Sequence, residues 1–456
     1  MEKARENDRN DFTKGSMSRN IIRLAMPLTV ALLINLLYSI VDRMYIGHTE
    51  PDGRLALTGI GLAFPLICVI SAFQQLCSSG GAPMCAIARG ALDDHEAERI
   101  MGNSFFMLLT SSVLLTVSGY IVKEPLLYLI GATDATFPFA NDYLDIYLLG
   151  KPFVLLGLGM NAFISAQGFG RVAMVTVLLG AIINLGLDPI LIFSCKMGVR
   201  GAALATVVAQ AISAFWSIAF LCGRRTLLRL RPSMIKPDFH LIGQIAGLGL
   251  SGFTAAITNS AVAMVYNAAL QSWGGDLYVG VMTVLNSIRE LIHTPVSGLV
   301  SGAQPVISYN YGAKQYARTF QGIRLVTFYC IGITTLIWAF IMLFPHALVM
   351  IFSRDALLVD AAVPSMRIFY CLFFMMSLQM TGQSVFVALG KSKHAVFFSL
   401  LRKVVLVIPA ALLLPGAFGV YGVLMAEPLS DLLGGVACYT SMYLSVGRKL
   451  KKDAAV

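Results

Sequence analysis

The segment INLGLDPILIF (183–193) lies in an apolar stretch long enough to cross a bilayer, yet it carries Asn184 and Asp188. These residues are four positions apart, so on a helix they share one face, one turn apart. Pro189 follows and lacks a backbone N–H, which frees a carbonyl one turn back, at Leu185. Because a charge inside hydrocarbon costs at least about 2.5–3.5 kcal/mol, we interpret the segment as a functional site rather than a packing pair.

The composition around this segment is that of a polytopic membrane protein. Of the 456 residues, 57% are hydrophobic and only 13% are charged, whereas soluble proteins carry about 25% charged residues. The eight cysteines form no CxxC motif or Cys/His cluster, so neither a metal site nor a disulfide framework is indicated. The first twenty residues are polar, contain no apolar signal core and are expected to form a cytosolic arm.

Twelve apolar spans follow from the hydropathy pattern, which predicts an all-α integral membrane protein. They cover residues 21–46, 55–88, 101–122, 141–167, 172–194, 200–222, 241–270, 277–308, 322–345, 362–389, 395–415 and 419–446. We expect an N-terminal arm (1–20), an N-lobe (21–222), a cytosolic linker (223–240), a C-lobe (241–446) and a cytosolic tail (447–456).

The basic residues lie mostly on one side of these spans. If the odd-to-even turns are outside, 25 of the 34 basic residues fall inside, a tally that includes Lys3, Arg5, Arg9, Arg402 and Lys403. The positive-inside rule then places both termini in the cytosol. It also explains the net charge of +10 without a nucleic-acid partner.

The two halves are a tandem repeat. With a shift of 222 residues, Pro83 aligns with Pro305, Gly90 with Gly312 and Gly168 with Gly390. The first span of each half starts on the same side, so these are parallel repeats with an axis along the membrane normal. Transporters bind substrates at the interface of such repeats. The repeat therefore favours a transporter of two pseudo-symmetric six-helix bundles.

The acidic residues break this symmetry. Asp42 aligns with Met264, Asn184 with Leu406 and Asp188 with Ala410, so the acidic group is confined to the N-lobe. Asp42, Asp188 and Thr206 each lie five or six residues from the outer end of their spans, roughly 8–9 Å deep. Two neighbouring carboxylates in a low dielectric cannot both ionise cheaply. We expect them to bind a proton, or a sodium ion with carbonyl and hydroxyl oxygens completing its shell.

Prolines on two of these spans predict bends. Pro27 lies fifteen residues before Asp42, and Pro189 follows Asp188. A bend at Pro27 could act as a hinge for the inner part of the first span, or could be a static kink.

The C-lobe has charges of its own. Arg289 and Glu290 sit near the middle of the eighth span, where they could compensate each other, pair with a neighbouring helix, or attract cationic substrates through Glu290. Glu427 and Asp431 share a face of the twelfth span. Near the end of each half the shift is 221, so Glu427 occupies the repeat position of Thr206. The candidates for lining an apolar substrate cavity are Met160, Met264, Met282, Arg289, Glu290 and Met376.

These features resemble the multidrug and toxic compound extrusion (MATE) family, closest to its MepA-like and DinF-like branches. The resemblance covers about residues 20–446 and rests on four stretches. They are RLAMPLTVALLINLLYSIVDRMYIG (23–47), INLGLDPILIF (183–193), GVRGAALAT (198–206) and GAQPVISYNYGAK (302–314).

The resemblance implies twelve helices in two six-helix lobes that form a V. It implies efflux of cationic and amphipathic drugs in exchange for protons or sodium, with no cofactor. Carried over by motif, Asp42, Asn184, Asp188 and Thr206 correspond to the family's N-lobe ion site, with Tyr143 and Asn161 as accessory polar groups. An acidic residue on the seventh span, present in some members, is missing between Leu241 and Leu270.

We therefore expect a monomeric secondary active exporter of the bacterial cytoplasmic (inner) membrane that works by alternating access. The alternative is a flippase for a lipid-linked oligosaccharide, from the same superfamily. Few basic residues at mid-membrane, chiefly Arg289 and Arg367, speak against binding of its pyrophosphate. An integral membrane enzyme is not favoured, because the six histidines are dispersed and no HExxH, GxSxG or phosphate-binding loop occurs.

Overall fold

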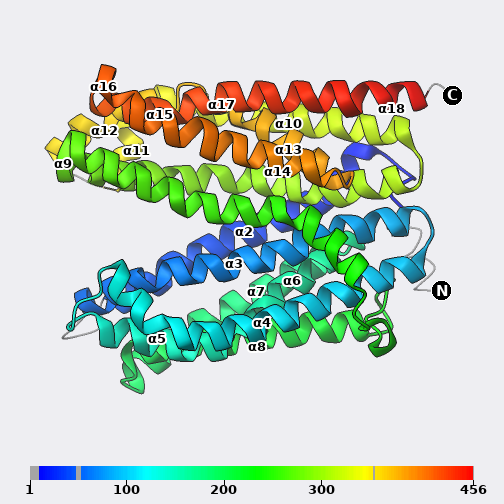
Figure 1. Cartoon of the computed structure of the whole chain (residues 1–456), viewed down its shortest axis with the longest axis horizontal. Helices are drawn as coiled ribbons and strands as arrows, with labels where there is room; N and C mark the ends of the chain where they lie inside the picture. Colours follow the sequence, from blue (N-terminus) through cyan, green and yellow to red (C-terminus); the bar gives the residue numbers. More distant parts are fainter. Residues whose placement is uncertain (1–9, 48–52, 353–354, 455–456) are drawn as a thin grey trace. The chain divides into compact units, whose positions relative to one another are not determined.

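The computed structural model describes residues 10–47, 53–352 and 355–454, and no strand occurs within these ranges. Lys3, Arg5 and Arg9 of the basic tally lie outside them. Helices dominate the described chain (Figure 1). This confirms the predicted all-α fold.

The first half contains eight helical elements, which follow the six predicted spans closely. They are α2 (Met17–Gly47), α3 (Gly53–Gly90), α4 (Asp94–Ile130), α5 (Phe137–Leu149), α6 (Lys151–Ala166), α7 (Gly170–Pro189), the π-helical η1 (Ile190–Ser194) and α8 (Gly198–Cys222).

The second half repeats this order with more interruptions. After the short η2 (Pro232–Met234) come α9 (Phe239–Gly312), α10 (Tyr316–Leu343), α11 (Pro345–Met350), α12 (Ala356–Phe369), η3 (Phe373–Met375), α13 (Met376–Ala388), α14 (Ser392–Leu400), the π-helical η4 (Leu401–Val407), α15 (Ile408–Leu413), α16 (Pro415–Phe418), α17 (Val420–Met442), the π-helical η5 (Tyr443–Gly447) and α18 (Arg448–Asp453).

Helix α9 contains two predicted spans. It is 74 residues long, and Gly275 inside it has a non-helical backbone (φ 64°, ψ −166°) that an L side chain rarely adopts. Gly275 therefore makes the turn between the spans predicted at 241–270 and 277–308. By length and composition, eight helices of the described chain could cross a membrane, or ten if each of two bent pairs is one span.

The two bent pairs lie at equivalent places of the repeat. Helices α5 and α6 meet at Gly150 at an angle of 58°, and α12 and α13 meet at 44°. A shift of 222 residues carries Gly150 to Leu372, which lies in the break between α12 and α13. The sequence pattern predicted each pair as one uninterrupted span, so the bends are a structural finding.

The chain forms two compact units that exchange the beginnings of their first helices. Unit 1 is Met1–Asp11 with Val30–Gly249, and unit 2 is Phe12–Thr29 with Leu250–Val456. Helix α2 thus begins in unit 2 and continues in unit 1, and α9 does the reverse. The boundaries fall next to Pro27 and Gly249, which are equivalent positions of the repeat. The predicted lobes, 21–222 and 241–446, follow the repeats and do not contain this exchange.

Glycines allow the exchanged segments to pack with backbone against backbone. In unit 2, a Cβ on Gly302 would lie 2.4 Å from the backbone N and Cα of Ala25. In unit 1, a Cβ on Gly249 would lie 1.7 Å from the carbonyl oxygen of Leu76. Neither site can hold a side chain without movement of the helices.

The linker is bound to unit 1 at several points. The side-chain oxygen of Gln167 accepts hydrogen bonds from the Leu228 N–H (2.8 Å) and the Thr226 hydroxyl (2.8 Å). Buried Glu98 accepts one from the Arg229 N–H (2.9 Å) and pairs with Arg231 (3.1 Å). The linker 223–240 is therefore an ordered segment that is bonded to unit 1.

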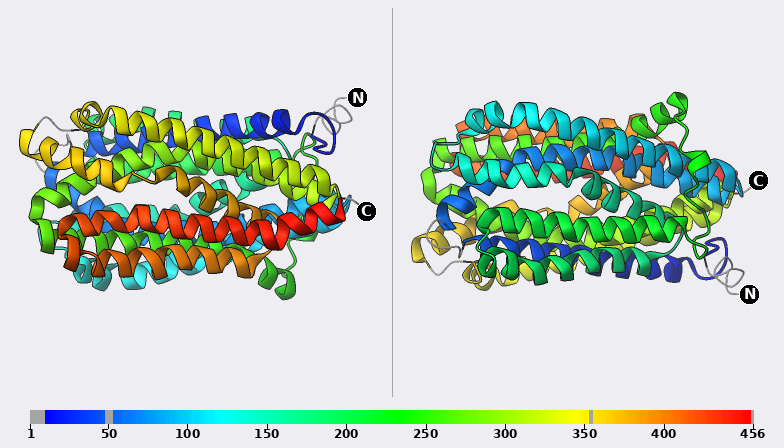
Figure 2. Two further views of the ribbon diagram at one scale, coloured as in Figure 1. Left: turned by 90° about the horizontal axis from the view of Figure 1, so that it is seen from above. Right: turned by 90° about the horizontal axis from the view of Figure 1, so that it is seen from below.

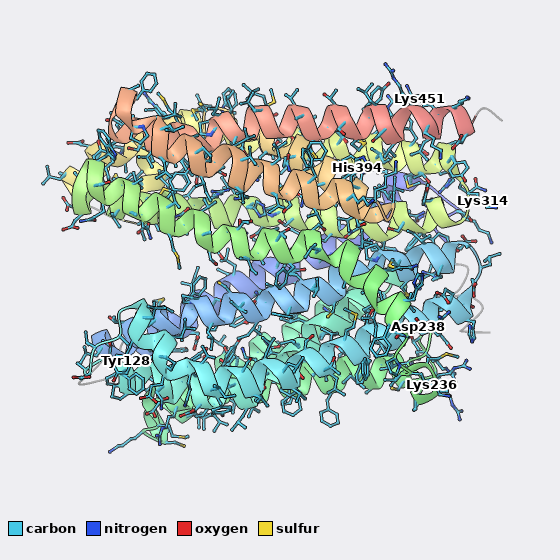
Figure 3. All side chains as sticks on the ribbon, in the orientation of Figure 1. Tyr128, Lys236, Asp238, Lys314, His394 and Lys451 are labelled. Carbon is cyan, nitrogen blue, oxygen red and sulfur yellow. The ribbon has the colours of Figure 1, made fainter. Side chains whose placement is uncertain are left out.

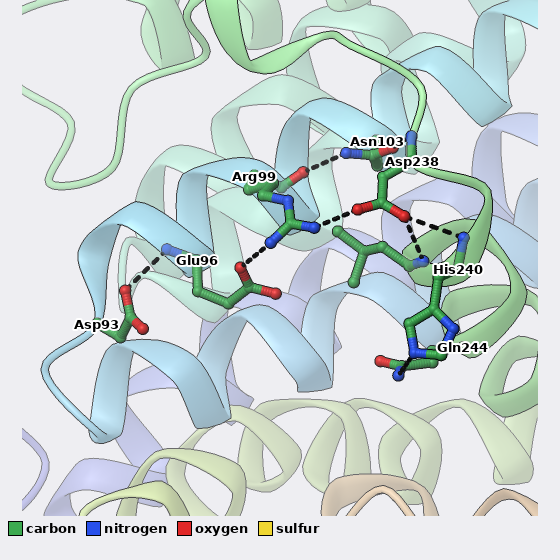
Figure 4. Close-up of polar contacts among 8 residues, drawn as sticks. Asp93, Glu96, Arg99, Asn103, Asp238, His240 and Gln244 are labelled. Atoms are coloured by element: carbon green, nitrogen blue, oxygen red, sulfur yellow. Dashed lines mark hydrogen bonds and ion pairs between the residues drawn. The ribbon is translucent and has the colours of Figure 1, made fainter.

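Near the end of the linker, Asp238 directly precedes α9 and binds Arg99 of α4 (Figure 4). Its carboxylate accepts hydrogen bonds from the N–H groups of His240 (3.0 Å) and Leu241 (3.1 Å) and pairs with Arg99. Its own N–H donates to Asn103 Oδ1 (2.8 Å). The Leu241 N–H and the Arg99 guanidinium hold the pKa of Asp238 below its usual value.

In unit 2, α17 lies beside α13 (Figures 1 and 2), and it brings two carboxylates into an ion network. Glu427 pairs with Arg289 of α9 and, at 2.6 Å, with Arg402 of η4. Arg402 also pairs with Asp431 at 3.0 Å. Arg402 was counted above toward the inner face, but it is only 8% exposed and lies within the eleventh span. Two carboxylates inside the unit hold its guanidinium, and the assignment of Arg402 to the inner side stays a prediction.

The ends of the helices can be followed in Figure 3. In unit 1, Tyr128 lies at the opposite end from Lys236 and Asp238. In unit 2, Lys314 and Lys451 lie at the same end. Within each unit, this is the alternation of turns that the predicted spans require.

Replacement of Gly302 by alanine should lower the thermal stability, because the new methyl group would force α2 and α9 apart. Overpacking of this kind costs typically 1–3 kcal/mol. Gly249→Ala should act in the same way in unit 1. Melting of the purified variants, followed by size-exclusion chromatography after heating, measures the effect.

The matched control is Gly332→Ala on α10, where a Cβ would meet nothing within 4 Å. Its melting temperature should equal or exceed the wild-type value, because alanine favours helix over glycine. Equal melting temperatures for Gly302→Ala and Gly332→Ala would show that the close approach does not hold unit 2 together.

Removal of Arg402 should destabilise unit 2, because Asp431 would lose its cation and Glu427 one of two. Breaking a buried ion pair costs about 3–5 kcal/mol. We expect Arg402→Met to reduce thermal stability and Asp431→Asn, added to it, to restore part of the loss. Thermal melting of both variants tests this, and a double variant no more stable than the single one would contradict the network.

Candidate functional site

The polar residues of α7 and α8 meet inside unit 1. The Asn184 amide nitrogen donates to Asp188 Oδ1 (3.3 Å) and to Thr206 Oγ1 (3.4 Å). Asp188 is 1% exposed and Asn184 3%. The amide thus connects a buried carboxylate to a hydroxyl on the next helix.

Asp42 of α2 completes this group. Its carboxyl group lies close to that of Asp188, near enough for the two negative charges to repel each other. A hydrogen bond between two carboxyl groups needs a proton on one of them. The structure therefore brings Asp42, Asn184, Asp188 and Thr206 together, and the pair can share one proton.

Small residues bring α7 and α8 close enough for these contacts. A Cβ on Gly201 would lie 2.8 Å from the Leu191 carbonyl, and one on Gly180 would lie 2.7 Å from Ser213 Oγ. Pro189 is the last residue of α7, and the π-helical η1 begins directly after it. Such π-turns are frequent at functional sites.

Tyr143 links the carboxylates to a row of side chains on the bent fourth span. It is buried and lies within electrostatic reach of Asp42 and Asp188. Its ring stacks on Tyr147 (centroids 5.6 Å apart, 23° between planes). The Nζ of Lys151 lies 4.1 Å from the Tyr147 ring centroid.

Lys151 was missed by the sequence reasoning. It is fully buried, and its Nζ has no hydrogen-bond partner among the described residues. Its repeat counterpart is Phe373, which is an ordinary core residue. Comparison of the two halves at this position would have identified the lysine.

Asn161 lies elsewhere. Its amide nitrogen donates to the Ala173 carbonyl (3.1 Å), which ties α6 to α7. Pro27 lies inside α2, which continues as one helix to Gly47. A hinge at Pro27 stays a prediction, as does one at Pro189.

The proposed substrate-cavity residues divide into two sets. Met160, Met282 and Met376 are at most 2% exposed and pack in the interiors of their units, whereas Met264 is 58% exposed. Arg289 pairs with Glu427 of a neighbouring helix, and Glu290 is exposed. Of the alternatives weighed for Arg289, the structure shows pairing with another helix.

The chemistry of the acidic group suits a proton or a small hard cation. Two carboxylates, an amide and a hydroxyl offer oxygen ligands of the kind that sodium takes. No group of three or more His, Cys, Asp or Glu side chains that could hold a metal ion occurs in the described chain.

The chain is similar to several known proteins over nearly its whole length. The chain is 24% identical to the multidrug export protein MepA of Staphylococcus saprophyticus subsp. saprophyticus over 435 residues, 95% of each chain. It is 24% identical to MepA of Staphylococcus haemolyticus over 448 residues, 97% of each. Among solved structures it is similar to a MATE protein in complex with MaL6, with a TM-score of 0.91, 21% identity, and 97% and 99% of the two chains covered.

The family model named MatE matches residues 27–190 and 253–413, one segment in each repeat. The matched segments include the whole acidic group except Thr206. The chain is a multi-pass membrane protein that belongs to the MatE family of transporters.

Proposed function

We propose that this protein is a secondary active exporter of cationic and amphipathic small molecules. The observation that carries the proposal is the pair formed by Asp42 and Asp188, which lie close enough to share a proton. Its repeat positions hold Met264 and Ala410, so unit 2 does not duplicate it. The names of the MepA relatives support the substrate class.

The coupling ion in this proposal is the proton. A proton from outside joins the carboxylate pair, neutralises part of its charge and lets the outer part of α2 approach α7. Release of the proton inside restores the repulsion between the carboxylates. Alternating access, with Pro27 as a hinge, then couples each proton to one export step. Sodium bound by Asp42, Asp188 and Thr206 is the competing assignment.

We also propose a monomer in the bacterial inner membrane with both termini in the cytosol. The distribution of the basic residues supports this orientation. The relatives are bacterial, which supports the location.

The lipid-linked oligosaccharide flippase is the second candidate, and the ion network of unit 2 bears on it. Arg402 is a second buried cation beside Arg289, but Glu427 pairs with both arginines and Asp431 pairs with Arg402. These cations are therefore not available to a pyrophosphate, which favours the exporter. Transport of lipid-linked sugar but not of ethidium by the purified protein in vesicles would reverse this order.

Asp42→Asn and Asp188→Asn should each abolish ethidium efflux driven by a pH gradient, because neither variant can cycle a proton between two carboxyl groups. Expression and melting temperature should stay close to wild type, since asparagine keeps the size and hydrogen bonding of the side chain. Efflux from inverted vesicles or proteoliposomes measures the loss.

Asp360→Asn is the matched control. Asp360 is an exposed carboxylate on α12, and its loss should leave efflux unchanged. Wild-type efflux by either Asp42→Asn or Asp188→Asn would disprove the assigned site.

The coupling ion can be tested with imposed gradients. In proteoliposomes, a pH gradient alone should drive ethidium efflux by the wild type, whereas a sodium gradient at constant pH should not. The reason is that the two carboxyl groups lie close enough to share a proton. The opposite result would make sodium the coupling ion and leave the site residues in place.

A further inference from the structure

Unit 2 carries a groove that the transport cycle does not use. It lies between α10 and the last helices of the chain, and its volume is about 670 Å³. An adjoining hollow of about 200 Å³ shares three of its lining residues. Their lining includes Phe320, Arg324, Phe328, Ile331, Tyr443 and Lys451.

The groove has an apolar part and a basic part. Phe328 is 71% exposed and Ile331 37%, and both lie on the face of α10 that lines the groove. Arg324 lies one turn before Phe328 and is exposed. The guanidinium of Arg324 and the apolar side chains of Phe328 and Ile331 therefore lie one after another along one face of α10.

Lys451 stands at the basic end. Its Nζ donates to the Tyr443 hydroxyl (3.2 Å) and lies 5.0 Å from the Phe320 ring centroid. In the part of the chain that the structure describes, neither Arg324 nor Lys451 pairs with a carboxylate. Lys451 is held close to two aromatic rings, and among the described residues no carboxylate compensates the charge of either cation.

Arg324 and Lys451 lie at the predicted edge of the membrane. The ninth predicted span begins at 322 and the twelfth ends at 446, so Arg324 and Lys451 flank the apolar region at the same end. Helices α10 and α18 are in contact there, and Figure 3 shows Lys451 at the end of α18. Exposed Arg448, Lys449 and Lys452 add positive charge beside the groove.

We propose that this groove binds a phospholipid with an anionic headgroup. Arg324, Lys451 and the Tyr443 hydroxyl take the phosphate, and one acyl chain lies along Phe328 and Ile331. Basic pockets between transmembrane helices on the cytoplasmic side are suited to such headgroups. Free phosphate would leave the apolar part uncovered, and a cationic drug would be repelled by the basic part.

The test measures lipid binding by the purified full-length protein with native mass spectrometry. Phosphatidylglycerol should bind in preference to phosphatidylcholine of the same acyl chains. The double variant Arg324→Gln/Lys451→Gln should bind phosphatidylglycerol about 30-fold more weakly, since each cation near an anionic lipid contributes about fivefold. Its binding of phosphatidylcholine should not change.

The control is Lys236→Gln/Lys314→Gln, which removes the same charge from two exposed residues that do not line the groove. It should bind phosphatidylglycerol as the wild type does. Both double variants should melt at the wild-type temperature without added lipid, which separates loss of the site from loss of the fold.

Three results would overturn the proposal. They are equal binding of the two lipids, wild-type binding of phosphatidylglycerol by Arg324→Gln/Lys451→Gln, or displacement of the lipid by millimolar inorganic phosphate. The last result would make the basic end a site for a soluble anion.

Discussion

The cost of placing charge in a low-dielectric environment governs both units. An ion removed from water loses several kcal/mol unless a partner compensates it. Unit 1 meets this constraint with two carboxylates close enough to share a proton, Asp42 and Asp188. Unit 2 meets it with an ion network in which Arg289 and Arg402 flank Glu427. The first solution can change its charge when a proton arrives, whereas the second is already paired.

This difference assigns different tasks to two halves with a common ancestry. Thr206 and Glu427 occupy equivalent positions, yet the hydroxyl accepts a hydrogen bond from Asn184 beside the carboxylate pair, whereas the Glu427 carboxylate belongs to an ion network. Lys151 and Phe373 are another such pair. The shared backbone bends near Gly150 and Leu372 were retained, while the side chains at them diverged.

The repeat and the periodic apolar spans made the fold predictable from the sequence. Asp42, Asn184, Asp188 and Thr206 could be identified because ionisable and polar groups are rare in such spans and lie at similar depth. The partner of Arg289 could not be predicted, because Glu427 lies 138 residues away and pairing depends on helix rotation. The bends at the fourth and tenth spans were also missed, although Gly150 and Pro152 mark a break in the fourth span. The exchange of helix segments could not be predicted from the hydropathy. In the sequence, Gly249 and Gly302 do not differ from other helix glycines, and only the structure shows that another backbone packs against each of them.

The exchanged segments also constrain how the chain can be synthesised and assembled. Phe12–Thr29 leaves the ribosome early, but the helix face that it packs on, around Gly302, is made nearly three hundred residues later. Unit 2 therefore includes a segment that is synthesised first, Phe12–Thr29. Unit 1 is complete only once Phe239–Gly249 has been translated. Contacts of such long sequence separation slow folding. The start of the first helix therefore lacks its packing partner, or is bound by the insertion machinery, until the second repeat has been synthesised. Neither repeat, cut at the linker, would carry all the residues of one compact unit.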